Sequence, residues 1–269
     1  MRREAGFVEA DGHRLECLWL GPRPQETDAP TIVFLHEGLG CVSLWRDFPE
    51  QLVAATGLGA LVYSRLGYGR SDPCALPRPV RYMHDEGIDG LPALLRAAGI
   101  GRHILVGHSD GASIALVYAG GTPATGLEAL ILEAPHVFAE EMGLASIASI
   151  NADYAGSGLR DRLARHHGDN VDVAFRGWAG AWLHPDFRHW NLEAYLPEVR
   201  VPSLIIQGEA DEYGTVAQCD AIARQTGAET SVLMLPDCGH APHRDQPEAT
   251  LQAMVRFVRA IAGRGVAAR

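Results

Sequence analysis

The chain has 269 residues, of which 47% are hydrophobic and 21% charged, which is enough for one large domain with a substantial buried core. Its 23 lysines and arginines against 33 acidic residues give a net charge of −10, which argues against binding to nucleic acid or to an anionic membrane. No apolar run approaches the roughly 20 residues of a membrane-spanning helix, and the start of the chain has no signal-peptide core.

The five cysteines have neither Cys-x-x-Cys nor metal-type spacing. The spacing predicts no bound metal. Reduced thiols, which are typical of the cytosol, are the simplest interpretation, so we expect a cytoplasmic protein. A small molecule is the expected substrate, and the chain is expected to be a monomer or a homodimer.

Short apolar strands alternate with helices over the first half of the chain. Residues 7–20 alternate in polarity around Asp11-Gly12, which predicts a two-stranded hairpin. The strands that follow are continuous apolar runs, which indicates burial on both faces. We predict these strands at 31–35, 60–64, 104–106 and 127–132, with helices at 45–55, 83–98 and from residue 112 onward. This alternation is typical of parallel βαβ units with helices on both faces of the sheet.

The pattern changes between residues 135 and 197, where helical patterns follow one another with no convincing strand between them. Three of the five tryptophans lie here, Trp178 and Trp182 among them. We predict a helical cap over one edge of the sheet, inserted into a core domain made of residues 1–134 and 198–269. The aromatic side chains of the cap either line a pocket or form the cap's own core.

The α/β pattern returns after the cap. Strands are predicted at 203–208 and 231–235, and helices at 216–226 and 247–261. The tail after Gly263 is expected to fray.

The most informative motif is Gly107-His108-Ser109-Asp110-Gly111, which lies between a predicted strand and a predicted helix. Glycines two positions before and after Ser109 leave room for the sharp turn of a nucleophile elbow, which lifts the serine hydroxyl above the sheet edge. The pattern alone is weak, because glycine and serine are common. A serine hydroxyl also needs a base, and the base needs an orienting acid.

Two histidines, His240 and His243, follow the last predicted strand. His240, directly after a glycine, is the predicted general base, and His243 is the less favoured alternative or a structural residue. Asp211 follows the preceding strand and is the predicted orienting acid, favoured over Glu209 and Glu212. In chain order the nucleophile comes first, the acid second and the base third.

Acyl transfer also needs hydrogen-bond donors for the oxyanion. One is predicted to be the backbone N–H of Asp110, directly after the nucleophile. The other is predicted in the turn His36-Glu37-Gly38-Leu39-Gly40, at Gly38 or its neighbour Leu39, where glycines let the backbone approach a substrate closely.

These motifs, together with Gly67-Tyr68-Gly69-Arg70-Ser71 and Gly208-Glu209-Ala210-Asp211, resemble those of capped serine hydrolases of the α/β-hydrolase fold over nearly the whole chain. The resemblance implies an eight-stranded, mostly parallel sheet with helices on both faces, a helical cap inserted after the sixth strand, and no cofactor. Two positions depart from the family pattern. Glu37 replaces the usual glycine after His36, and Asp110 replaces the apolar or neutral residue that commonly follows the nucleophile.

Both departures bring a carboxylate near the nucleophile. Glu37 either pairs with Arg65, at the end of the neighbouring strand, or repels anionic substrates. The side chain of Asp110 has no explanation from the sequence. Together with the net charge of −10, these two acids weakly disfavour polyanionic substrates such as coenzyme A thioesters.

The favoured function is hydrolysis of a carboxylic ester or thioester through an acyl-serine intermediate. The alternatives are a carbon–carbon bond hydrolase of the meta-cleavage type, an amide hydrolase with the same triad and, from another class, a ligand receptor on the same fold. The aromatic cap predicts a small to medium, apolar or aryl substrate. The candidate substrate-contacting residues are Glu37, Leu39, Trp178 and Trp182.

Overall fold

The structure, a computed structural model, describes residues 1–267 of the chain, with side chains to residue 262. Eight strands form one sheet: β1 (Arg3–Ala10), β2 (His13–Leu20), β3 (Thr31–Leu35), β4 (Ala60–Tyr63), β5 (His103–His108), β6 (Leu127–Glu133), β7 (Ser203–Gly208) and β8 (Thr230–Leu235). Their order is β1-β2-β4-β3-β5-β6-β7-β8. The pairs β1–β2 and β2–β4 are antiparallel, and all other neighbours in the sheet are parallel. The predicted eight-stranded, mostly parallel sheet is confirmed.

The register of the parallel strands aligns their carboxyl ends. Leu35 pairs with Gly107, and His108 pairs with Glu133. The central strands β3 and β5 are buried along their whole length, which explains their continuous apolar runs. Residues that directly follow β3, β5, β6, β7 and β8 therefore meet at one edge of the sheet, where open α/β sheets bind their ligands.

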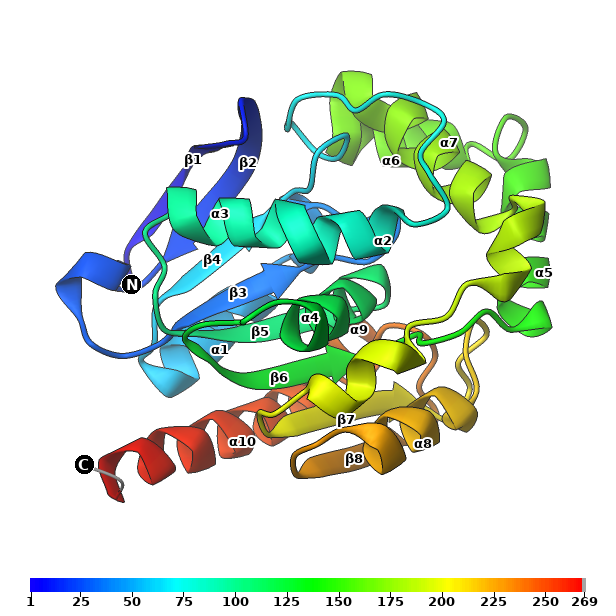
Figure 1. Ribbon diagram of the computed structural model, residues 1–269. Coiled ribbons are helices and arrows are strands. Elements are labelled where there is room, and N and C mark those ends of the chain that lie inside the picture. Colours follow the sequence, from blue (N-terminus) through cyan, green and yellow to red (C-terminus); the bar gives the residue numbers. More distant parts are fainter. Residues whose placement is uncertain (268–269) are drawn as a thin grey trace.

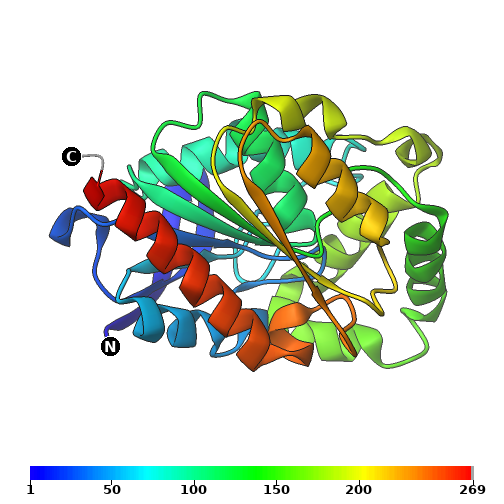
Figure 2. The ribbon, with the colours of Figure 1, turned by 90° about the horizontal axis from the view of Figure 1, so that it is seen from below.

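Helices cover both faces of the sheet (Figures 1 and 2). One face carries α1 (Phe48–Thr56) and α10 (Pro247–Ala267), which lie in front in Figure 2. The other face carries α2 (Tyr82–Asp85), α3 (Leu91–Ala97), α4 (Asp110–Gly121) and α8 (Val216–Gln225). The helix predicted at 83–98 contains a π turn between α2 and α3. α10 continues beyond its predicted end at Ile261 and is helical through Ala267, whereas a frayed tail is expected after Gly263; residues 268 and 269 lie outside the described part.

The segment between β6 and β7 forms three helices beyond the carboxyl edge of the sheet (Figure 1): α5 (Glu141–Asp153), α6 (Leu159–His167) and α7 (Val171–Trp182). Apolar residues at helical spacing over 138–154 and 171–182 predict α5 and α7, but α6 is missed, because six of its nine residues are Arg, Asp or His. A single β-bridge between Phe138 and Asn191 joins the two ends of this cap. The 3-10 helix η6 (Glu193–Glu198) then packs on α4 and α8 of the core.

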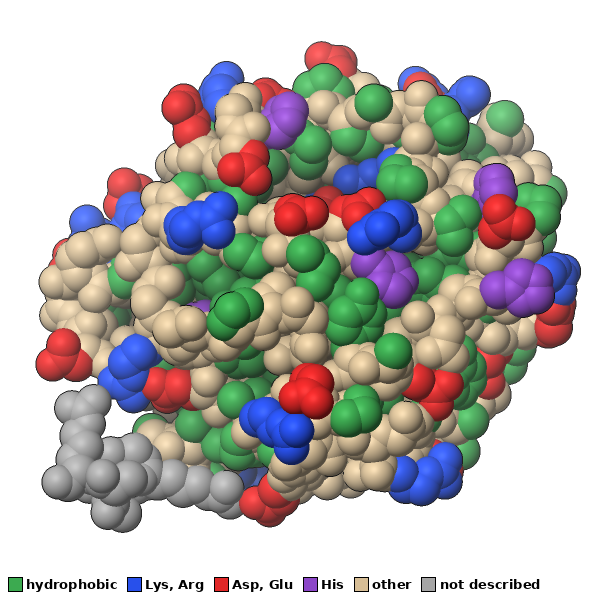
Figure 3. All heavy atoms as spheres, viewed as in Figure 1, with side chains coloured by type: hydrophobic (Ala, Val, Ile, Leu, Met, Phe, Trp, Pro, Cys, Tyr) green, Lys and Arg blue, Asp and Glu red, His purple; other side chains and the backbone are tan. Residues whose placement is uncertain are grey.

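Charged side chains are spread over the surface. Figure 3 shows acidic and basic groups interspersed over one face of the molecule. Within residues 1–267, no helix combines the length and the apolar character needed to span a bilayer.

Candidate active site

Ser109 lies at the turn between β5 and α4, where the elbow motif predicts it. Its φ of 53° and ψ of −116° are strained for a residue with a side chain. The two flanking positions must be glycine, because other backbone atoms lie where a side chain would begin. A Cβ at Gly107 would lie 2.5 Å from the Gly111 carbonyl oxygen, and a Cβ at Gly111 would lie 2.1 Å from the Leu35 oxygen. The elbow therefore brings the start of α4 against the end of β3, where the predicted oxyanion turn begins.

The structure brings Ser109, His240 and Asp211 together from the ends of three strands. His240 Nε2 lies 2.9 Å from Ser109 Oγ. His240 Nδ1 lies 2.9 and 2.8 Å from the two carboxylate oxygens of Asp211. With the Nδ1 proton donated to Asp211, Nε2 is free to accept the serine proton.

Asp211 is held firmly in the ionised form. Its carboxylate accepts hydrogen bonds from the backbone N–H groups of Tyr213 at 2.8 Å and Gly214 at 3.2 Å. The side-chain amide of Gln207 donates to it at 2.8 Å. Burial raises the pKa of this carboxyl, but the hydrogen bond and the charge of His240 outweigh burial, so the pKa lies below its ordinary value.

The alternative acids and base do not belong to the triad. Glu209 and Glu212 are exposed, and within the described chain the carboxylate bound to His240 is that of Asp211. His243 is buried, and its Nδ1 lies 2.8 Å from Glu133 Oε2, which also accepts the His243 backbone N–H. His243 thus belongs to a separate histidine–carboxylate pair.

The turn after β3 brings the second predicted oxyanion donor to the site. Within residues 1–267, no acceptor takes the N–H of Gly38, and the N–H of Asp110 lies in the first turn of α4, where helical N–H groups have no intrahelical partner. His36 fixes the turn: its Nε2 accepts the Arg65 backbone N–H at 3.0 Å, so its Nδ1 donates to the Glu37 carbonyl oxygen at 2.7 Å. Both predicted donors are therefore free for a ligand.

The cap also contacts this turn. His167, the last residue of α6, accepts the Gly69 N–H at Nδ1 and donates through Nε2 to the Leu39 carbonyl oxygen, each at 3.0 Å. Trp178 of α7 lies directly against Gly38, where a Cβ would be 2.1 Å from the indole Nε1. The position of the turn therefore depends on two cap helices.

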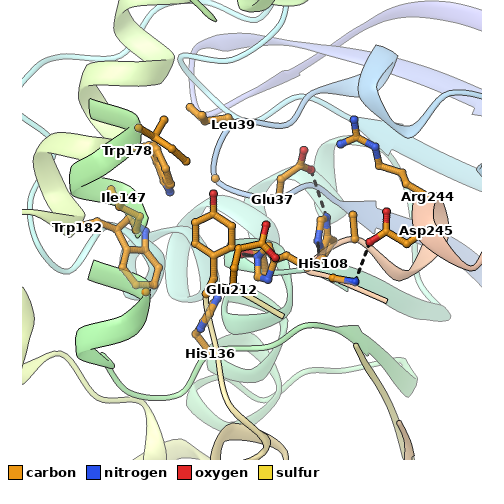
Figure 4. Close-up of a pocket in the computed structure, with 18 residues that line it drawn as sticks. Glu37, Leu39, His108, His136, Ile147, Trp178, Trp182, Glu212, Arg244 and Asp245 are labelled. Atoms are coloured by element: carbon orange, nitrogen blue, oxygen red, sulfur yellow. Dashed lines mark hydrogen bonds and ion pairs between the residues drawn. The ribbon is translucent and has the colours of Figure 1, made fainter. Parts of the chain in front are cut away.

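The carboxylate of Glu37 faces His108, and the predicted pairing of its side chain with Arg65 is wrong. Glu37 Oε2 lies 3.5 Å from His108 Nδ1 (Figure 4), whereas Arg65 donates to the Glu37 backbone oxygen at 3.1 Å. Burial opposes the charge on both partners, but their mutual attraction outweighs burial. It holds the pKa of Glu37 well below its ordinary value and that of His108 above its own. His108 Nε2 lies 2.7 Å from the carbonyl oxygen of His240, so this pair supports the segment that carries the base.

The side chain of Asp110 is enclosed in a polar cluster. It is fully buried and accepts hydrogen bonds from the Tyr82 hydroxyl and from Trp182 Nε1, the latter at 3.3 Å. Arg65 Nη2 lies 3.7 Å from the same carboxylate, and the Arg65 side chain is also fully buried. Because Trp182 belongs to α7, the cluster joins the core to the cap.

A cavity of about 380 Å³ opens beside the triad (Figure 4). All four candidate substrate-contacting residues line it, namely Glu37, Leu39, Trp178 and Trp182. Figure 4 shows apolar side chains on one side of the cavity, from Leu39, Ile147, Trp178 and Trp182. It shows charged groups on the other side, from Glu37, His108, Arg244 and Asp245. The cavity thus has an apolar half next to the cap and a charged half next to the core.

Sequence reasoning missed His136, Tyr213 and Ile147 in the lining of the cavity. His136 comes soon after β6, and Tyr213 lies two residues after Asp211, so both follow strand ends, the signal that located the triad. Burial, and next the charge of His240, lower the pKa of His136 to about 3, so its ring is neutral near pH 7.

Metal-ligating side chains do not gather elsewhere in the described chain. Within residues 1–267, no group of three or more His, Cys, Asp or Glu side chains is arranged to hold a metal ion. All five cysteines are unpaired, and four of them are buried.

One curated relative is similar over a limited stretch. The (lyso)-N-acylphosphatidylethanolamine lipase of Homo sapiens is 33% identical to this chain over 95 residues. The alignment covers 35% of this chain and 27% of the human protein, so the chain matches only about a quarter of that protein's length.

Solved structures share the fold over nearly the whole chain. The 2-hydroxy-6-oxo-6-phenylhexa-2,4-dienoate hydrolase of Rhodococcus sp. strain RHA1 has a TM-score of 0.79 at 15% identity, over 96% of this chain and 99% of that chain. An esterase from Exiguobacterium antarcticum has a TM-score of 0.74 at 19% identity, over 95% of this chain and 100% of that chain. A family model described as the alpha/beta hydrolase family matches residues 32–253. The chain therefore belongs to the α/β hydrolase family.

Proposed function

We propose that the protein is a serine hydrolase that cleaves a carboxylic ester or thioester of a small to medium, apolar or aryl substrate. The observation that carries the proposal is the unbroken series of contacts from Asp211 through His240 to Ser109 Oγ. The free N–H groups of Gly38 and Asp110 at the same edge give further support. Membership of the α/β hydrolase family supports hydrolysis as the reaction.

The reaction proceeds in two halves. Ser109 Oγ attacks the carbonyl carbon while its proton passes to His240 Nε2, and the N–H groups of Gly38 and Asp110 stabilise the oxyanion. Collapse of the tetrahedral intermediate breaks the bond to the leaving oxygen or sulfur, which takes the proton from His240. Water then attacks the acyl carbon and gives a proton to His240. The second collapse releases the carboxylic acid and returns a proton to Ser109.

The lining and the volume of the cavity support a substrate with an apolar acyl group. Its apolar half is lined by Leu39, Ile147, Trp178 and Trp182. A volume of about 380 Å³ is at the small end of ligand pockets, which suits a short or aromatic acyl chain. The charged half, with Glu37 and Arg244, leaves a more polar environment for the leaving group.

Covalent labelling by a fluorophosphonate tests the proposal, because this reagent phosphonylates an activated serine. Ser113 provides a matched control, since it lies four residues from Ser109 in the same buried segment. We expect the natural protein and Ser113→Ala to gain one phosphonyl group and to hydrolyse p-nitrophenyl butyrate. Ser109→Ala is expected to do neither. A natural protein that is neither labelled nor active on esters, or a label on another residue, overturns the proposal.

A further inference from the structure

Arg65 is a buried cation next to the oxyanion turn, and the triad does not use it. Its terminal nitrogens donate to the backbone carbonyl oxygens of His36 at 2.8 Å and of Glu37 at 3.1 Å. Nη2 also lies 3.7 Å from the carboxylate of Asp110. Within residues 1–267, its Nε has no hydrogen-bond partner. A fully buried ion pair with an unsatisfied donor is a poor source of stability, which points to another role for this side chain.

The first contact of interest is with the Glu37–Gly38 peptide. The Glu37 carbonyl oxygen and the Gly38 N–H belong to one planar unit, so fixing the oxygen also fixes the direction of the N–H. That oxygen accepts three hydrogen bonds, from Arg65 Nη2, from His36 Nδ1 and, at 3.1 Å, from the Gly40 backbone N–H. A positive charge on the oxygen side of the peptide also polarises its N–H toward a stronger donor. Arg65 thus acts on one oxyanion donor through the backbone.

The second contact is with Asp110, whose N–H is the other oxyanion donor. An ionised carboxylate on this residue opposes the negative charge that develops on a nearby oxyanion. Arg65 is the cation in contact with that carboxylate, while Tyr82 and Trp182 donate hydrogen bonds to it. The Asp110 side chain, at the start of α4, is therefore held in place by hydrogen bonds and paired with a positive charge.

We propose that Arg65 is a positioning residue of the oxyanion hole, which aligns the Glu37–Gly38 peptide and balances the charge of Asp110 beside the second donor. This inference rests on the proposed function, because it concerns the same site. Arg65 is fully buried and does not line the cavity beside the triad, so its action on the oxyanion passes through these neighbours. Its removal should weaken binding of the oxyanion in the transition state and leave binding of the uncharged ester unchanged.

The test compares Arg65→Met, Asp110→Asn and the double variant with the natural protein. We expect Arg65→Met to lower kcat by about 10- to 100-fold, less than the effect of deleting a donor itself, with KM within about twofold. Affinity for a trifluoromethyl ketone, whose serine adduct carries an oxyanion, should fall by the same factor. Asp110→Asn should have a smaller effect. Added to Arg65→Met, it should recover part of the lost kcat, because no unbalanced carboxylate remains.

Arg78→Met is the matched control. The Arg78 side chain is also largely buried and paired, with Glu86 at 3.1 Å, but it does not contact the oxyanion turn. We expect it to lower the melting temperature while kcat and ketone affinity stay within about threefold of the natural protein. An Arg65→Met protein with unchanged kcat, or with its loss in KM alone, overturns the inference. So does an equal loss of ketone affinity in Arg78→Met.

Folding of the variants is checked by thermal unfolding. If Arg65→Met does not fold, the double variant is compared with Asp110→Asn, since both lack the buried carboxylate charge. Equal kcat in these two overturns the inference, and a loss of about tenfold on removing the arginine supports it. If the double variant also does not fold, Arg65→Lys decides, because one ammonium group cannot bond both carbonyl oxygens in the same fork geometry. Natural kcat in Arg65→Lys overturns the inference, and a loss of kcat with matching loss of ketone affinity supports it.

Failure of this inference is distinguishable from failure of the proposed function. If the proposed function is wrong, the natural protein itself shows neither serine labelling nor ester hydrolysis. If only the role of Arg65 is wrong, the natural protein is labelled and active, and the arginine variants retain its kcat and ketone affinity.

Discussion

Replacing Glu37 by glutamine tests whether Glu37 and His108 form an ion pair that stabilises the fold. The Glu37 carboxylate, 21% exposed, lies 3.5 Å from Nδ1 of the His108 ring, which is 2% exposed. At about this separation the Coulomb attraction is about 5 kcal/mol with an effective dielectric constant of about 20. Removal of both groups from water offsets most of that attraction. We therefore expect Glu37→Gln to lower the free energy of unfolding by about 1–2 kcal/mol where both groups are charged.

The contribution of this pair has a defined pH window. The pKa of Glu37 is depressed below its ordinary 4.5, so its contribution is present above pH 4.5 and is lost as the pH falls through the folded-state pKa. The pKa of His108 is raised above its ordinary 6.5, so its contribution is fully present below pH 6.5 and is lost as the pH rises through the folded-state pKa. The loss of stability in Glu37→Gln should be largest between pH 4.5 and pH 6.5, where both groups are charged. It should shrink in alkaline solution, where His108 loses its proton.

Chemical denaturation followed by tryptophan fluorescence, at about pH 5.5 and about pH 9, measures this effect. Glu198→Gln is a suitable control, because Glu198 pairs with Arg200 at 3.2 Å with both side chains 64% exposed. Exposed pairs contribute little, so the control should show no measurable change at either pH. A loss of stability in Glu37→Gln that is equal at both pH values refutes the reasoning, as does no loss in the acidic sample.

Three further changes test the site itself. Asp211→Asn should lower kcat by about 10³- to 10⁴-fold with little change in KM, because an amide no longer fixes the tautomer of His240; Glu209→Gln in the same loop should leave steady-state kcat unchanged. Gly38→Ala should lower kcat/KM, because its methyl group would lie 2.1 Å from Trp178 Nε1, and adding Trp178→Ala should restore part of the activity if this collision is the cause. Trp178→Ala alone should move the preference among p-nitrophenyl esters toward longer acyl chains, and an unchanged preference would place the acyl group elsewhere in the cavity.

The contacts of the triad could be predicted because they follow from the register of the sheet. Ser109, Asp211 and His240 each come within a few residues of a strand end, and parallel strands align those ends at one edge. The strands themselves are short, continuous apolar runs bounded by turns. The order of apolar runs and turns along the sequence is therefore sufficient to predict which residues meet at this edge.

The surroundings of the two departing carboxylates could not be predicted in the same way. The partners of Asp110 include Trp182, 72 residues further along the chain, on a helix whose docking depends on the whole cap. The sequence predicts that Arg65 lies near Glu37, but not the direction of either side chain. In the structure Arg65 bonds the backbone oxygen of Glu37, and the Glu37 carboxylate faces His108. The helix α6, rich in Arg, Asp and His, is missed from the sequence, and with it the two hydrogen bonds that His167 makes to the turns at Gly69 and at Leu39.

The two departures from the family pattern make contacts inside the protein, although Glu37 also lines the cavity. The expectation that Glu37 and Asp110 make the site repel anions assumed that neither carboxylate has a basic partner. Instead, Asp110 is fully buried against Arg65, and Glu37 contacts a histidine, His108, whose own pKa is raised. Each carboxylate therefore lies beside a basic group, which reduces its effect on a bound anion, and Arg244 adds a positive charge to the cavity lining among acidic neighbours. A net charge of −10 describes the whole surface and does not determine the local field at a bound acyl group.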